Sequence, residues 1–136
     1  MTPTQLIKQE LLETALKLLK MNATATMILA LETKNEQIKA TLRAIGNNIT
    51  EVVLYVTAKL AMNQFIEVTD KESDAVIEKT KNVLFQSALC LRTLSTANED
   101  NKELADKLFS LSNLQHKAYR TCEITLSAIK EVEAEK

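Results

Sequence analysis

The scarcity of glycine and proline limits how this chain can fold more than any other feature, because it contains one of each. β-Proteins reverse direction at every hairpin, and their turns draw heavily on these two residue types. A chain that is so poor in turn residues reverses only a few times and needs long elements between its reversals. The sequence therefore predicts an all-α protein built from long amphipathic helices.

Length and charge set further bounds on the fold and on its partners. With 136 residues, 46% of them hydrophobic, the chain can bury roughly two thirds of its unfolded surface without a metal or a disulfide. We predict a single helical-bundle domain over residues 1–136. The formal net charge of −1 gives no reason to expect nucleic acid or an anionic membrane as a partner.

The N-terminal segment lacks the pattern of a secretory signal and that of a membrane span. Charged residues such as Lys8, Glu10 and Glu13 interrupt the region where a signal peptide has its apolar core. The longest uncharged stretch, residues 21–31, is shorter than the ~20 residues that a helix needs to cross a bilayer. We therefore expect a cytoplasmic protein without a membrane span.

Two apolar stripes with different phases occupy the first half of the chain. The first contains Ile7, Leu11, Ala15 and Leu18, and the second runs from Leu31 through residues 38, 42, 45, 49, 52 and 56 to 60. The second stripe, extended backwards, does not meet the first. We therefore predict a kink or a break near residues 22–26, where Asn and Thr side chains compete for the helix's backbone hydrogen bonds.

The single glycine, Gly46, allows two interpretations. It precedes Asn47 and Asn48, and a Gly beside Asn is typical of a helix end followed by a new N-cap. The apolar stripe, however, continues through this point without a change of phase. We prefer a turn at Gly46, and the alternative is one long helix from about residue 24 to 66.

Two later boundaries are clearer. Thr69 followed by Glu72 resembles a capping box, and the polar run at residues 98–101 interrupts the apolar pattern and supplies capping residues. The predicted helices span about 3–45, 48–66, 70–97 and 101–134. Since short connections make successive helices antiparallel neighbours, we predict an antiparallel up-and-down four-helix bundle.

Metal, cofactor and catalytic sites lack the residues that they require. A di-iron bundle needs Glu-x-x-His on two helices, and the only histidine, His116, follows Asn113 at that spacing. Cys90 and Cys122 are too few for a zinc site, and we expect both to be buried and free. We predict a protein that is not an enzyme, with no cofactor and no small-molecule substrate.

His116 supports an alternative function. Histidine phosphotransfer modules are four-helix bundles of similar length with an exposed histidine, and this chain resembles them in those respects. In that family a Lys stands three residues after the histidine and a small residue follows it. Here Tyr119 and Arg120 occupy those positions. The resemblance would make His116 the phosphoacceptor of a signalling module.

The preferred function is protein interaction through helical surfaces, with a protein partner or with a second copy of the chain. In the predicted bundle the first and last helices extend beyond the middle two. The first is the candidate docking or exchangeable element, and the preferred alternative is that it is simply a helix of the core. The extension would expose apolar residues and favour a homodimer. These candidate interaction residues are Leu6, Ile7, Leu11, Leu12 and Val132. A lipid-coating bundle ranks lower, because the polar faces have mixed charge.

Overall fold

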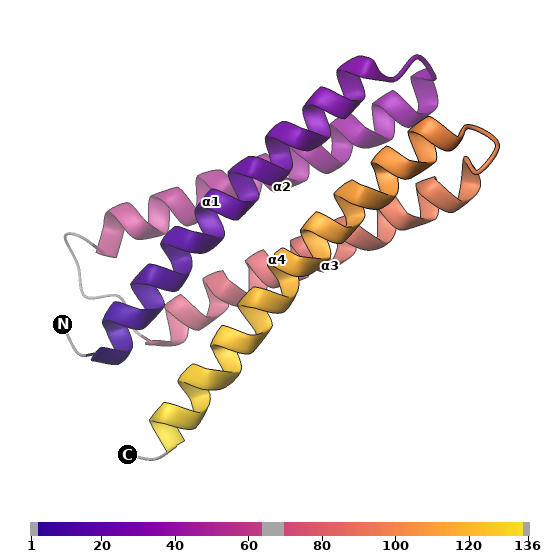
Figure 1. Cartoon of the computed structure of the whole chain (residues 1–136). Coiled ribbons are helices and arrows are strands. Elements are labelled where there is room, and N and C mark those ends of the chain that lie inside the picture. The colour runs from indigo at the N-terminus through magenta and orange to yellow at the C-terminus, as the bar shows by residue number, and fades with distance from the viewer. Residues whose placement is uncertain (1–2, 64–69, 135–136) are drawn as a thin grey trace.

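The computed structural model contains four long helices and no strand in the residues that it describes, which are 3–63 and 70–134 (Figure 1). The helices are α1 (Pro3–Glu32), α2 (Glu36–Asn63), α3 (Asp70–Ala97) and α4 (Lys102–Ala134). Side-chain positions are described for these residues except 4, 5, 8, 62, 63, 70–74, 76, 125, 129, 132 and 133. The predicted all-α fold is confirmed.

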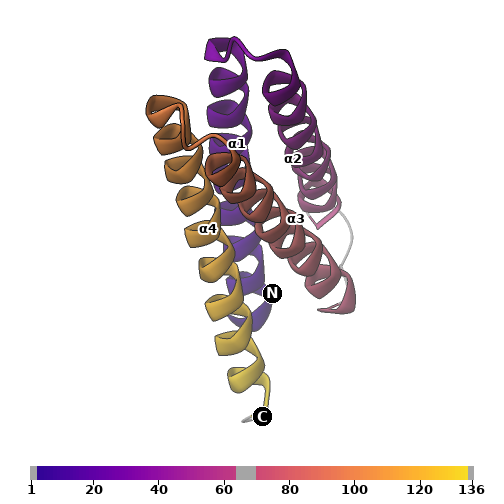
Figure 2. The ribbon, with the colours of Figure 1, turned by 90° about the vertical axis from the view of Figure 1, so that its right-hand side faces the viewer.

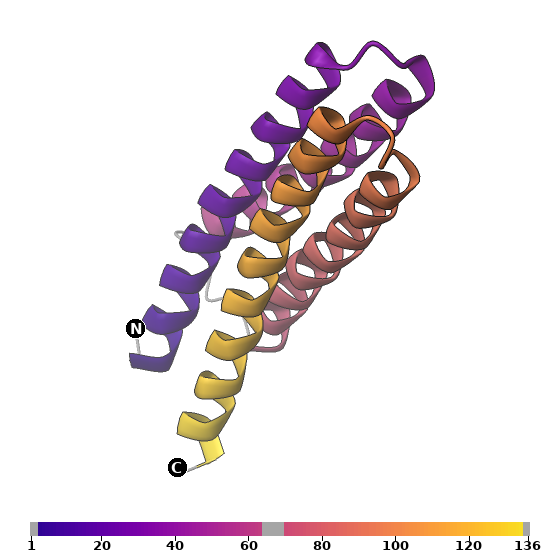
Figure 3. The ribbon, with the colours of Figure 1, turned by 45° about the vertical axis from the view of Figure 1, so that its right-hand side comes forward.

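The helices form two antiparallel hairpins that pack side by side. α1 packs most extensively on α2, and α3 on α4, while α1 makes a smaller contact with α4. The α1–α2 and α3–α4 connections lie at one end of the bundle, and the start of α1 and the end of α4 lie at the other (Figures 1 and 3). This arrangement confirms the up-and-down four-helix bundle.

The first chain reversal occurs at residues 33–35, not at Gly46. Thr33 ends α1, with its hydroxyl donating to the Leu29 carbonyl at 2.7 Å. Asn35 then caps α2, because its Oδ1 accepts the amide hydrogens of Gln37 and Ile38 at 3.0 and 3.2 Å. The predicted turn at Gly46 is therefore wrong, and so is the alternative of one helix from 24 to 66.

Gly46 instead lies inside α2, where it allows α1 to approach closely. A Cβ atom at this position would lie 2.6 Å from the Sδ atom of Met27 on α1. Its φ angle is not positive, so the glycine is used for its small size. The unbroken apolar stripe of α2 was therefore a better guide to this position than the neighbouring Asn residues.

α1 is also continuous through residues 22–26, where we expected a kink or a break. Asn22 and Thr26 are buried and continue the core-facing side of the helix from Leu19 to Leu29 in steps of three and four residues. The predicted phase difference between the two stripes had two causes. We took the polar Asn22 and Thr26 to be exposed, and we assigned Leu31 to the core although it is exposed. The predicted break is wrong for these reasons.

The helices are similar in length, which corrects the predicted extension of α1. α1 has 30 residues, α2 and α3 have 28 each, and α4 has 33. Only α4 is clearly longer, by five residues or about 7 Å. Because α2 begins at residue 36 and runs back along α1, Leu11 and Leu12 are packed in the core.

The second turn follows the sequence prediction closely. Asn98 Nδ2 donates to the Leu94 carbonyl at 2.8 Å, and Asn101 Oδ1 accepts the Leu104 amide hydrogen at 3.3 Å. Two hydroxyls then join α3 to α4: Ser95 donates to the Ala105 carbonyl and Ser112 to the Ala88 carbonyl, both at 2.7 Å. The predicted N-cap at Thr69 lies outside the described residues.

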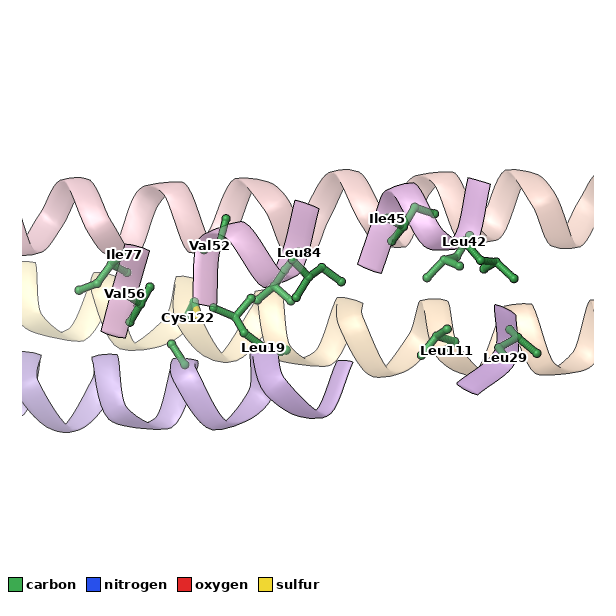
Figure 4. Close-up of a cluster of buried hydrophobic side chains, with 14 of the residues drawn as sticks. Leu19, Leu29, Leu42, Ile45, Val52, Val56, Ile77, Leu84, Leu111 and Cys122 are labelled. Atoms are coloured by element: carbon green, nitrogen blue, oxygen red, sulfur yellow. The ribbon is translucent and has the colours of Figure 1, made fainter. Parts of the chain in front are cut away.

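The core between the four helices is aliphatic. Leu, Ile, Val and Ala side chains from all four helices meet along the bundle axis, together with Cys122 (Figure 4). None of the aromatic side chains that the structure describes is buried. The largest fully buried aliphatic side chains are Leu12, Leu19, Leu42, Ile49, Val56, Ile77, Leu84, Leu91 and Leu108.

A small polar cluster interrupts this core between α1 and α4. Gln115 Nε2 donates to Thr26 Oγ1 at 3.4 Å, and Thr26 donates to the Asn22 carbonyl at 2.7 Å. Within the described residues, neither polar side-chain atom of Asn22 has a hydrogen-bond partner, and Gln115 Oε1 has none either. Because unpaired buried amides oppose folding, this cluster is a weak point of the α1–α4 contact.

Replacing Asn35 tests whether its side chain sets the start of α2. We expect Asn35→Ala to lower the free energy of unfolding by about 1 kcal/mol, because two amide hydrogens lose their acceptor. Asn35→Ser keeps an acceptor and should lose little. Equilibrium urea unfolding measures both, with Asn47→Ala, an exposed position inside α2, as the control. An equal loss in Asn35→Ala and Asn47→Ala would contradict the capping role.

Asn22 provides a second test, this time of the polar cluster in the core. We expect Asn22→Leu to raise the free energy of unfolding by about 1 kcal/mol, because an unpaired amide is replaced by apolar surface. Asn22→Asp should lower it by about 2 kcal/mol or more at neutral pH, since a carboxylate is then buried without a partner.

The pH dependence of the two Asn22 variants separates a charge effect from a packing effect. The deficit of Asn22→Asp should shrink as the pH falls towards about 4, where the carboxyl becomes neutral in the unfolded chain too. Asn22→Leu should show no such change relative to the wild type. A loss in Asn22→Leu as large as that in Asn22→Asp would show that the amide is well satisfied.

Candidate interaction surfaces

The described residues hold no grouping suited to metal chemistry. No three His, Cys, Asp or Glu side chains among them gather closely enough to bind a metal ion. None of the helices, over the residues described, has a segment long and apolar enough to span a bilayer. What remains to be explained on the bundle is a set of exposed apolar side chains, several of which form two surfaces.

The first surface lies along α3 and α4 and is rich in aromatic side chains. Phe85 and Phe109 keep 40% and 46% of their side-chain surface exposed, although Phe is among the residues most often buried. Leu89, between them, is 52% exposed. We call this region the α3–α4 aromatic surface, and it consists of Phe85, Leu89, Arg92, Phe109, His116 and Tyr119.

Contacts between its side chains hold this surface in place. The Phe85 and Tyr119 rings lie 5.1 Å apart, and the Tyr119 hydroxyl donates to Glu123 Oε2 at 2.6 Å. This hydrogen bond is also the largest cause of the raised pKa of Tyr119. The Arg92 guanidinium lies 5.0 Å from the centre of the Phe109 ring. The same guanidinium donates to Asn113 Oδ1 at 2.9 Å.

A small hollow opens in the middle of the α3–α4 aromatic surface. Its volume is about 130 Å³, and Phe85, Leu89, Arg92 and His116 stand around it. Pockets for small-molecule ligands usually measure roughly 300–1,000 Å³. The hollow is therefore too small for such a ligand and matches one apolar side chain of a protein partner.

His116 is exposed on α4 and belongs to this hollow. Its ring lies 5.9 Å from that of Tyr119. Its surroundings are thus largely aromatic and apolar, with Arg92 across the hollow. Its exposure agrees with the sequence expectation, and a phosphoacceptor role stays a prediction.

The second surface is a stripe on the side of α1 that faces away from the core. Met21, Ile28 and Leu31 are 57%, 51% and 72% exposed and lie on one line along the helix. Lys17 and Thr24, which are also exposed, complete the line. We call these five residues the outer stripe of α1.

The predicted interaction residues are not brought together as one surface. Leu6 and Ile7 are exposed, as expected, near the start of α1. Leu11 and Leu12 are buried in the core, because α2 covers the segment that we expected to extend beyond it. The side chain of Val132 lies outside the described residues. The predicted exposed apolar end is therefore corrected at Leu11 and Leu12.

A groove between α1 and α4 adjoins the outer stripe. It measures about 490 Å³, and Ile28, Leu29, Leu111 and Leu114 form its apolar part. At one end Lys107 Nζ lies 3.2 Å from Glu32 Oε2, and the hydrogen bond to Glu32 raises the pKa of Lys107. The outer stripe and this groove thus form a continuous apolar area that ends in charged residues.

Sequence reasoning missed both surfaces, although the spacing of their residues was visible. Phe85, Leu89 and Arg92 follow each other at steps of four and three, as do Met21, Thr24, Ile28 and Leu31 at steps of three and four. Each set is one helix side, but only Leu31 among them was assigned to a stripe, and it was taken as part of the core. Two separate apolar periodicities within one helix would have been the signal.

The two cysteines differ in environment, although we expected both to be buried. Cys122 is in the core, where burial raises the pKa of its thiol, while Cys90 is exposed on α3. Both are free thiols. The prediction was right for Cys122 and wrong for Cys90, which is exposed at the edge of a pocket between α2 and α3.

This difference predicts unequal reactivity of the two thiols. In the folded protein a maleimide should modify Cys90 at least about tenfold faster than Cys122, because a thiol reacts as an accessible thiolate. Mass spectrometry of digested protein gives both rates, and in denaturant they should become similar. Rapid modification of Cys122 in folded Cys90→Ser protein would contradict the packing described here.

Comparison with known proteins gives no family to which these surfaces could be assigned. No protein-family model matches the chain, and no curated protein or solved structure is significantly similar to it. The arguments about function therefore rest on the surfaces themselves.

Proposed function

We propose that this protein is a non-enzymatic interaction module that binds a protein partner through the α3–α4 aromatic surface. The observation that carries the proposal is the exposure of Phe85 and Leu89 around a hollow of side-chain size, with the exposed Phe109 beside it in contact with Arg92. Burying them would remove a large apolar area from water, at roughly 25 cal/mol per Å². That gain is what an unoccupied binding surface offers to a partner.

The composition of the surface supports binding of a protein more than any other use. Aromatic residues and arginine are enriched in the parts of interfaces that contribute most to affinity. Arg92 is already held against Phe109 and Asn113, so it would lose little side-chain entropy on binding. The interaction surface is thus largely formed before a partner arrives.

The charges around the surface favour an acidic amphipathic helix as the partner. Arg92 contacts Phe109, and Arg120 stands exposed near Glu123, which bonds Tyr119. Glu123 is engaged by Tyr119 and lies 3.9 Å from Arg120. A helix with an apolar stripe could lie between α3 and α4, place one side chain in the hollow and pair its carboxylates with the arginines.

Substitutions on the surface test the proposal without disturbing the core. We expect Phe85→Ala and Phe109→Ala each to weaken binding by about 30-fold, as for a central interface residue. Partners are first captured from lysate of the native cell with wild-type protein, and the affinity of the purified partner is then measured by calorimetry. Leu54→Ala removes an even more exposed apolar side chain (65%) from α2 and should bind like the wild type.

The control decides how the result is understood. Unfolding curves of all three variants should lie close to that of the wild type, since each altered side chain is largely outside the core. A partner that binds Phe85→Ala and Phe109→Ala as well as Leu54→Ala does not use the aromatic surface. That outcome would exclude this surface as the binding site.

A further inference from the structure

α1 is apolar on two opposite sides. It is the most hydrophobic and the least one-sided of the four helices. One side packs in the core, and the other carries the exposed Met21, Ile28 and Leu31. A helix that is apolar all round is normally buried on every side. In the described part of the chain nothing covers the outer stripe of α1.

The spacing of the outer stripe is that of a helix that packs against another helix. Lys17, Met21, Thr24, Ile28 and Leu31 follow each other at steps of four, three, four and three residues. This is the alternation of the two contact positions in a coiled coil. Thr24 stands at the middle of the stripe, where a small side chain lets two helices approach closely.

Charges at the two ends of the stripe identify the partner that it fits. Lys17 begins the stripe, and Glu32 lies beside its other end, 15 residues or about 22 Å further along α1. Glu32 already pairs with Lys107 of its own chain at 3.2 Å, but its side chain is half exposed and can accept a second cation. A second α1 in the parallel direction would place Lys17 against Lys17 and Glu32 against Glu32. A second α1 in the antiparallel direction would place each lysine against a glutamate, so the stripe is complementary to itself.

We propose that the outer stripe of α1 is the interface of a two-fold symmetric homodimer in which the two α1 helices pack antiparallel. Met21 then lies opposite Ile28 of the second copy, and Lys17 lies opposite Glu32 of the second copy. Thr24 lies at the two-fold axis, beside the same residue of the other chain. Such an interface uses the same surface on both copies and closes after two chains.

The neighbouring groove enlarges the area that the dimer covers. Ile28 belongs to both the outer stripe and the groove, whose apolar wall on α4 is formed by Leu111 and Leu114. Side chains of the second α1 can therefore contact α4 as well as α1. The interface involves none of the residues of the α3–α4 aromatic surface, so it is independent of the proposed partner site.

Sedimentation velocity measures the association directly. We expect wild-type protein to be dimeric at micromolar to submillimolar concentrations. Ile28→Glu should weaken the dimer by about 100-fold or more, because it buries an unpaired carboxylate at the interface. Leu54→Glu, on the exposed side of α2, should leave the dimer unchanged. A wild-type monomer throughout this range, or a dimer that Ile28→Glu leaves intact, overturns the proposal.

Disulfide trapping tests the antiparallel direction. In a Cys90→Ser background, Thr24→Cys should form a disulfide-linked dimer on mild oxidation, because this position lies beside itself at the axis. Leu31→Cys should not, since its copies would be about 20 Å apart along the helices. Equal cross-linking at both positions would indicate parallel helices and overturn the assigned direction.

A pair of charge variants completes the test and shows that folding is not the cause. Lys17→Glu should weaken the dimer by about tenfold, because it faces Glu32 of the second copy. The double variant Lys17→Glu, Glu32→Gln should recover much of that loss, because it removes the facing carboxylate without placing a second cation beside Lys107. Circular dichroism confirms that each variant is folded. A double variant whose dimer is weaker than that of Lys17→Glu contradicts the pairing. Loss of partner binding in Phe85→Ala tests the proposed function and does not bear on the dimer.

Discussion

Packing of aliphatic side chains between the four helices is the interaction on which the rest of this structure depends. The core contains Leu, Ile, Val and Ala layers, and the helices lie close enough that a Cβ atom on Gly46 would meet Met27. The described aromatic side chains lie outside this core, and Tyr55 and Tyr119 pack against its edge. Phe85 and Phe109 are exposed on α3 and α4 (Figure 2 shows the ribbons of these two helices).

The contacts between the two hairpins are weaker than those within each. Within α3–α4, Ser95 and Ser112 join the helices by hydrogen bonds to backbone carbonyls of the opposite helix. Between the hairpins, α1 meets α4 through a polar cluster in which Asn22 has no side-chain partner among the described residues. A buried amide without a hydrogen-bond partner lowers the stability of the contact that buries it. The α1–α4 contact is therefore weaker than the α3–α4 contact.

The fold was predictable from the sequence because its main signals are local. The lack of turn residues fixed the class, and the polar run at residues 98–101 located one reversal within a residue. The first reversal was missed because Asn35 resembles any polar helix residue, whereas Gly46 beside two Asn resembled a turn. The role of Gly46 depends on its close contact with Met27 of α1, and the residues next to Gly46 in the sequence do not reveal that contact.

The surfaces were less predictable, because the sequence alone does not show whether an apolar side of a helix faces the core or the solvent. In α1 both sides are apolar, and only the position of α2 and α4 shows that Leu12 is inside and Leu31 outside. This same property links the two proposals. A dimer formed through α1 leaves the α3–α4 aromatic surface of each copy free, so one dimer presents two partner sites. A partner with two docking helices would then bind with an affinity above that of either site alone, provided that its linker spans them.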